Sequence, residues 1–216
     1  MTPLRPFLHQ GLVVLCLLIA WAAPAVAADW LEWRPIQGPC NGDCGVAGYF
    51  GWYVEEGMSD VFISSPETPL TWTYAGDHLL AGAVTRRIAT LWSHVDVEPE
   101  FGVGQRMGKQ HETEIWGAVF FRWRGFPWDD RLITTVAIST GMNYATDISD
   151  EEQDRARDGK GDRWLHFFSP EITFALPSRP DVELLFRVHH RSGVFGLVSD
   201  AWGGAQYASV GLRFRF

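Results

Sequence analysis

The ten C-terminal residues, 207–216, alternate strictly between apolar and polar side chains and end on a phenylalanine. One face holds Ala208, Val210, Leu212, Phe214 and Phe216, and the other holds Tyr207, Ser209, Gly211, Arg213 and Arg215. Because side chains alternate between the two faces of a strand, this segment predicts a β-strand with one apolar face and one face that is solvated or charge-paired. The alternation alone leaves open whether the apolar face contacts lipid or fills the core of a soluble, lipocalin-like barrel.

The N-terminal residues 1–28 have the features of a secretory signal peptide. They carry Arg5 and no acidic residue, an apolar stretch over 11–20, and the small-x-small sequence of residues 25–27. A retained transmembrane anchor is the weaker alternative, because the apolar stretch is shorter than the about 20 residues that span a bilayer. We therefore expect residues 29–216 to form one exported domain.

The charge and cysteine content limit the possible partners. The chain has 18 basic and 26 acidic residues, a net charge of −8, which argues against nucleic acid as a partner. Cys40 and Cys44 are close together in a chain exported to an oxidising compartment, which predicts a small disulfide loop. A metal site is the alternative, although a single pair of cysteines lacks the second ligand pair that such sites use. The predicted functions require no metal or cofactor.

Eight segments alternate in this way and have roughly the length of tilted transmembrane strands. They cover 45–56, 76–91, 93–106, 112–125, 130–144, 163–176, 181–192 and 205–216. In the second segment the adjacent residues Arg86 and Arg87 cannot both point inward, so its assignment is ambiguous. The pattern predicts an all-β fold, an eight-stranded antiparallel up-and-down transmembrane β-barrel.

The charged faces and the connections favour the membrane barrel over the soluble one. With the apolar faces turned to lipid, the interior would contain Asp96, Glu98, Glu100, Glu171 and Glu183 together with Arg122, Arg187, Arg213 and Arg215. Short connections at 91–92, 125–129 and 177–181 oppose longer ones at 57–75, 145–162 and 193–204, an asymmetry typical of outer-membrane barrels. The acidic stretch 145–162 is interpreted as a solvated loop rather than a cation site.

Aromatic residues are expected near both rims of the barrel, where a bilayer interface favours them. Trp92, Trp123 and Trp128 fall near the short connections, and Tyr144, Trp164 and Trp202 near the long ones. The terminal Phe216 resembles the signal by which outer-membrane assembly machinery recognises its clients. We therefore expect the protein in the outer membrane of a Gram-negative cell, in contact with its bilayer and this machinery.

Candidate chemistry lies on segment 181–192. Its even-numbered residues are apolar up to position 188, and His190 and Ser192 continue that lipid-facing side toward the extracellular end. A histidine two residues from a serine on one face can act as a general base for the hydroxyl. If the hairpin register pairs 192 with 206, Gln206 lies beside Ser192 and diagonally from His190. His189 has the opposite parity and should point inward, toward a carboxylate such as Glu171 or Glu183.

This arrangement resembles the lipid A 3-O-deacylases of Gram-negative outer membranes, in architecture over most of the exported chain and in motif over 187–216. The resemblance implies hydrolysis of the ester that joins an acyl chain to the 3-position of lipid A glucosamine, so lipid A or lipopolysaccharide is the expected substrate. Ser192 would be the nucleophile, His190 the base, and Gln206 would replace the family's glutamate. Gly193 replaces an asparagine that helps to bind the oxyanion, a role its backbone amide could take. Asp200 is an alternative acid.

Two other functions compete with hydrolysis. One is a structural or ligand-binding small barrel, including a deacylase relative that has lost activity, because an amide at position 206 cannot stabilise an imidazolium with a full charge. The other is an outer-membrane acyltransferase that adds a phospholipid chain to lipid A. A porin-like channel is not expected, because eight strands leave an interior filled by side chains.

Overall fold

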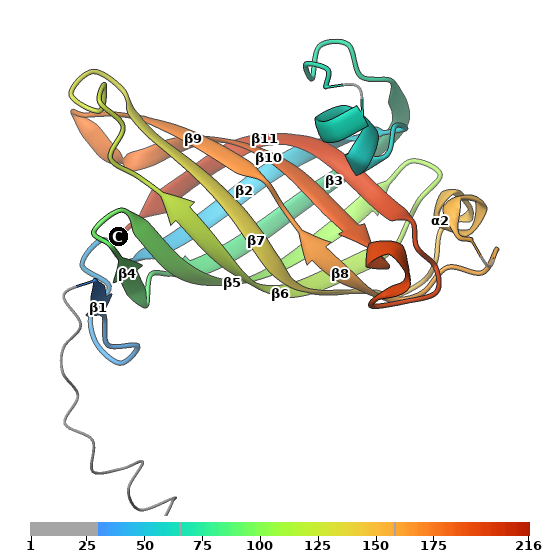
Figure 1. Ribbon diagram of the computed structural model, residues 1–216, viewed down its shortest axis with the longest axis horizontal. Coiled ribbons are helices and arrows are strands. Elements are labelled where there is room, and N and C mark those ends of the chain that lie inside the picture. The colour runs from blue at the N-terminus through green and yellow to red at the C-terminus, as the bar shows by residue number, and fades with distance from the viewer. Residues whose placement is uncertain (1–29, 65, 158) are drawn as a thin grey trace, which may run out of the picture.

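The computed structural model describes residues 30–64, 66–157 and 159–216, which form an eight-stranded antiparallel β-barrel (Figure 1). The predicted signal peptide lies outside the described residues. The barrel strands are β2 (Cys44–Val54), β3 (Tyr74–Arg86), β5 (Val95–Met107), β6 (Thr113–Trp123), β7 (Ile133–Ala145), β8 (Trp164–Phe168) continued by β9 (Glu171–Leu176), β10 (Arg179–Ser192) and β11 (Gly204–Arg215). Each pairs with its neighbours in sequence, and β11 pairs with β2 to close the barrel.

Two predicted segments are interrupted. Segment 76–91 is not one strand, because β3 ends at Arg86 and a short β4 (Ala89–Leu91) pairs with an unpredicted β1 (Leu31–Trp33). Between them, Arg87 turns to Asp43 and to Asp96, whose carboxylate is 3.2 Å away. Segment 163–176 is broken at 169–170, where a proline lacks the N–H that a strand ladder needs.

The apolar faces of the strands point outward and the charged faces point inward. The side chains of Glu98, Glu100 and Glu171 are buried, whereas Phe101, Val103 and Ile138 are exposed on the barrel surface. The interior carboxylates are paired: Arg122 contacts Glu98 at 2.8 Å, Arg187 contacts Glu100 at 2.8 Å, and Arg213 contacts Glu171 at 2.8 Å. Buried charges need such partners, whereas an apolar exterior suits lipid. The structure therefore confirms the membrane-type barrel and excludes the soluble barrel with an apolar core.

The two ends of the barrel differ in the length of their connections, as predicted. We call the end with connections 55–73, 146–163 and 193–203 the long-loop end, and the opposite end the short-turn end. Among the described residues, the long connections contain three short helices: η1 (Asp60–Ser64), α2 (Asp150–Arg155) and η2 (Val194–Gly196). In the described part of the chain, no helix is long and apolar enough to cross a membrane.

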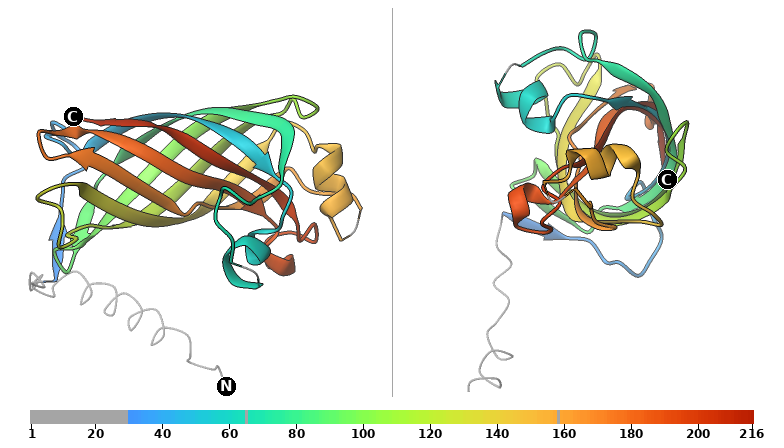
Figure 2. Two further views of the ribbon diagram at one scale, coloured as in Figure 1. Left: turned by 90° about the horizontal axis from the view of Figure 1, so that it is seen from above. Right: turned by 90° about the vertical axis from the view of Figure 1, so that its right-hand side faces the viewer.

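Helix α2 lies over the mouth of the barrel at the long-loop end (Figure 2). Its Glu152 is buried and reaches Arg106 and Arg191, each at 3.2 Å. The inward-pointing His189 lies in the same region, but its carboxylate partner is Glu114 at 3.3 Å, so the expected pairing with Glu171 or Glu183 is wrong. Those two carboxylates lie too far toward the short-turn end, where Arg213 binds both of them.

The short-turn end carries aromatic residues and the disulfide. Trp92 and Trp128 are exposed there, and Trp30 stacks on Trp92 with ring centroids 5.8 Å apart. Cys40 and Cys44 form the predicted disulfide, and Cys44 exchanges backbone hydrogen bonds with the terminal Phe216. The chain terminus is therefore fixed to the first barrel strand.

Candidate functional site

The register of β10 and β11 places Gln206 differently from the expected arrangement. His190 pairs directly with Gln206, and Ser192 pairs with Gly204. The register therefore differs by two residues from the expected pairing of Ser192 with Gln206. Even-numbered residues of β10 do face outward, as predicted. Gln206 is therefore the direct neighbour of His190, the position in which its side chain can orient the imidazole.

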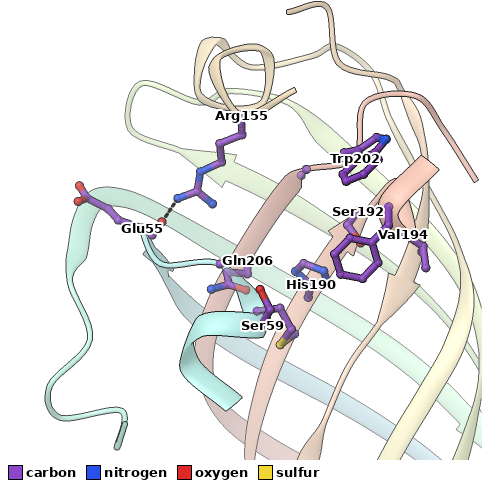
Figure 3. Close-up of a pocket in the computed structure, with 13 residues that line it drawn as sticks. Glu55, Ser59, Arg155, His190, Ser192, Val194, Trp202 and Gln206 are labelled. Carbon is purple, nitrogen blue, oxygen red and sulfur yellow. Dashed lines mark hydrogen bonds between the residues drawn. The ribbon is translucent and has the colours of Figure 1, made fainter. Parts of the chain in front are cut away.

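The predicted residues His190, Ser192 and Gln206 all line one pocket of about 410 Å³ on the outside of the barrel, at the long-loop end (Figure 3). The remaining lining residues come from the loops and strand ends around it: Glu55, Gly57, Met58, Ser59, Arg155, Val194, Phe195, Trp202, Gly203 and Gly204. The pocket thus lies between connection 55–73 on one side and connection 193–203 on the other.

Connection 55–73 is held against the outer wall of the barrel by apolar packing and by hydrogen bonds. Val61 and Trp72 are buried against Val188 of β10 and Ala208 of β11. The side-chain amide of Gln206 donates to the backbone carbonyl of Glu56. Position 206 therefore has a structural role in addition to its place beside His190.

Glu56 fixes the base of the same connection. Its carboxylate accepts hydrogen bonds from the backbone N–H of Thr73 at 2.9 and 3.1 Å. Desolvation raises the pKa of Glu56, but the hydrogen bonds from Thr73 and the charge of Arg155 together lower it by more, so its pKa lies below the ordinary value. The carboxylate is therefore the form that holds the connection closed.

His190 has a ring nitrogen without a hydrogen-bond partner in the described part of the chain. Its Nδ1 atom is buried and, like Oε1 of the paired Gln206, has no hydrogen-bond partner among the described residues. A glutamine oxygen can accept a hydrogen bond from Nδ1–H, which leaves Nε2 as the proton acceptor.

Ser192 lies two residues further along the same face, about 6.5–7 Å away along the strand. In the described part of the chain its hydroxyl makes no side-chain hydrogen bond with His190. Across the sheet it pairs with His166 of β8, whose Nε2 is 2.8 Å from the hydroxyl of Thr140. The sequence interpretation did not include His166, because its position depends on the register of β8 and β10.

Gly193 occupies a site without room for a larger residue. A Cβ atom there would lie 2.4 Å from the carbonyl oxygen of Ser199 and 2.7 Å from the backbone nitrogen of Trp202. Its backbone N–H donates to the carbonyl of Gly203 at 3.4 Å, and Gly193 does not line the pocket. The oxyanion role assigned to this amide stays a prediction.

The next two residues have an unusual backbone conformation. Val194 and Phe195 both line it and have positive φ angles of 51° and 54°. Their N–H groups donate to no backbone carbonyl of the described residues. Asp200, the alternative acid, is exposed and does not line the pocket.

Arg155, at the end of α2, adds a positive charge to the pocket. Its guanidinium donates to the carbonyl of Glu55 and lies 5.0 Å from the ring centroid of Tyr53. It forms no salt bridge with a carboxylate of the described residues, unlike the paired arginines of the barrel interior. The sequence did not indicate that Arg155 belongs to the site, because Arg155 lies in a connection interpreted as a solvated loop.

The chain was compared with family models, curated proteins and solved structures. No family model matches the chain. No curated protein matches it either. The crystal structure of Neisserial surface protein A is similar over 80% of this chain and 96% of that chain, with 9% sequence identity and a TM-score of 0.45.

Within the described residues, no group of three or more His, Cys, Asp or Glu side chains is arranged to hold a metal ion.

Proposed function

We propose that this protein is an outer-membrane serine esterase that removes a 3-O-linked acyl chain from lipid A. The observation that carries the proposal is that Ser192, His190 and Gln206 line one pocket on the lipid-facing wall of a membrane barrel. An ester buried in a bilayer leaflet can reach a nucleophile there without leaving the membrane. The long-loop end would then face the cell exterior, because outer-membrane barrels carry their longer loops on that side.

In this proposal Ser192 Oγ attacks the ester carbonyl carbon while His190 Nε2 accepts the hydroxyl proton. Oε1 of Gln206 accepts a hydrogen bond from Nδ1–H and holds the ring in this tautomer. When the tetrahedral intermediate collapses, His190 returns the proton to the sugar oxygen that leaves. Water then cleaves the acyl-enzyme by the reverse proton path and releases the fatty acid.

Arg155 is the feature of the pocket that favours an anionic glycolipid as substrate. It forms no salt bridge with a carboxylate of the described residues and lines the pocket together with Glu55, whose backbone carbonyl accepts its hydrogen bond. A guanidinium is well suited to a lipid A phosphate, because its planar fork of donors matches the phosphate oxygens. The N–H groups of Val194 and Phe195 offer neutral donors for the oxyanion.

A non-catalytic barrel that binds a lipid in the same pocket is the second candidate. Two observations favour it. The amide of Gln206 is engaged with Glu56, and in the described residues no carboxylate forms a hydrogen bond with His190. Without a charged partner, the imidazolium formed during the reaction is less stable, and the base is weaker. A barrel that only binds lipid would keep the pocket and lose nothing when Ser192 is replaced.

Lipid A mass spectrometry tests the proposal. The protein is expressed in a host whose lipid A keeps its 3-O-linked chains, beside the variants Ser192→Ala and Ser59→Ala. Ser59 is the matched control, because its hydroxyl lines the same pocket from the facing loop. The proposal expects loss of one hydroxyacyl chain with wild type and Ser59→Ala but not with Ser192→Ala.

Other outcomes point to the competing functions. An unchanged spectrum from a correctly folded barrel would contradict hydrolysis and support the lipid-binding function. A gain of acyl mass would instead indicate an acyltransferase.

A further inference from the structure

Two loops at the long-loop end fold back along the outside of the barrel instead of extending away from it. In both views of Figure 2, connection 55–73 with η1 and connection 193–203 with η2 lie outside the barrel wall. The packing of Val61 and Trp72 on Val188 and Ala208 confirms this for the first loop. Because Val188 and Ala208 belong to the outward faces of β10 and β11, this loop lies on the surface that faces lipid.

The tips of both loops are apolar and exposed. Ile63 and Leu70 are 77% and 94% exposed, and Phe195 and Leu197 are 70% and 85% exposed. These values exceed that of Phe186 on the barrel wall, which is 41% exposed. Exposed apolar patches of this kind mark interaction surfaces.

Connection 55–73 also carries polar residues, both at its base and, as the exposed Asp60 and Glu67, close to its apolar residues. Glu55 and Glu56 form the base of connection 55–73 and make hydrogen bonds there with Arg155, Thr73 and Gln206. A segment that exposes apolar side chains together with polar ones has the character of an interfacial element, which lies at the boundary between headgroups and acyl chains. Because Val61 and Trp72 pack on the apolar wall of the barrel, the same bilayer can cover the wall and this loop.

We infer that connections 55–73 and 193–203 insert into the outer leaflet beside the barrel, so that the pocket between them opens sideways into lipid. The partner of this surface is the acyl region of outer-leaflet lipids just below the headgroups. A ligand of the pocket then enters laterally from the membrane and not from water. This inference does not depend on catalysis, because it concerns where the loops lie and which phase the pocket opens to.

Depth-dependent fluorescence quenching tests the inference. Single cysteines at Ile63→Cys and Leu197→Cys are labelled with an environment-sensitive NBD probe under conditions that keep the native disulfide of Cys40 and Cys44. Phe186→Cys on the barrel wall is the lipid control, and Asp154→Cys on α2, an exposed position, is the water control. Each protein is reconstituted into phosphatidylcholine–phosphatidylglycerol vesicles that contain lipids with a nitroxide at a shallow or a deep acyl position.

The expected result is blue-shifted emission at both loop positions, strong quenching by the shallow nitroxide and protection from aqueous iodide. Iodide quenching equal to that of Asp154→Cys, without nitroxide quenching, would overturn the inference. The heat-dependent shift in gel mobility that folded barrels show confirms that each variant is folded before it is measured. Because no activity is measured, failure of this inference and failure of the esterase proposal are distinguishable.

Discussion

Replacing Gln206 by glutamate tests the role of His190 more directly than removing either residue. Gln206 pairs directly with His190, and its Oε1 atom is buried without a hydrogen-bond partner among the described residues. A hydrogen bond to a charged group contributes about 1.5–3 kcal/mol, whereas a neutral one contributes about 0.5–1.5 kcal/mol. The carboxylate should therefore stabilise the imidazolium in the transition state by about 1.5 kcal/mol more than the amide, which corresponds to roughly a tenfold faster reaction.

The same change has a structural cost. Glutamate cannot donate to the carbonyl of Glu56, so connection 55–73 loses one of its attachments to the wall. We expect the free energy of unfolding to fall by about 0.5–1.5 kcal/mol, because this partly buried hydrogen bond is lost. The variant should thus be faster and less stable, which separates the two roles of Gln206.

The assay is the initial rate of fatty acid release from purified lipid A in detergent micelles. Wild type, Gln206→Glu, Gln206→Ala and Gln206→Glu combined with Ser192→Ala are compared at one pH. Gln206→Ala is the matched control, since it removes the same attachment to Glu56 without adding a charge. If folded Gln206→Glu is no faster than Gln206→Ala, His190 is not the base, and the reasoning is refuted.

Three further predictions concern the barrel and its loops. Removing the buried carboxylate of Glu171 with alanine should cost about 3–5 kcal/mol in unfolding free energy, because the buried Arg122, Arg187 and Arg213 each lose one of their two carboxylate partners; urea titration followed by gel mobility measures it, and a loss below 1 kcal/mol would contradict the charge-paired interior. Glu152→Ala should release α2 from the barrel mouth and make it sensitive to protease, whereas the exposed Asp154→Ala should not. Because the pKa of Glu56 is lowered in the folded protein, its stabilisation of connection 55–73 should be complete above its ordinary value of 4.5 and disappear as the pH falls through the lowered value. Protease cleavage of that loop should then increase only at acidic pH, and Glu56→Gln should abolish this dependence.

The sequence by itself determined the barrel. Alternation with a period of two assigns each side chain of a strand to one face, so the interior charges and the lipid-facing residues of β10 could be predicted without the fold. Two segments were exceptions: 76–91, where the adjacent Arg86 and Arg87 conflict with alternation, and 163–176, which is interrupted at Pro170. The disulfide followed from the spacing of Cys40 and Cys44.

Only the tertiary structure decided the composition of the site. The register of β10 and β11 places Gln206 beside His190, and parity cannot fix register, because a shift by two residues keeps every side chain on the same face. The positions of Arg155, Ser59 and Trp202 depend on how three loops fold against the wall, which no local periodicity encodes. Period-two patterns act within a strand, whereas a pocket between loops arises from contacts between segments that are distant in sequence.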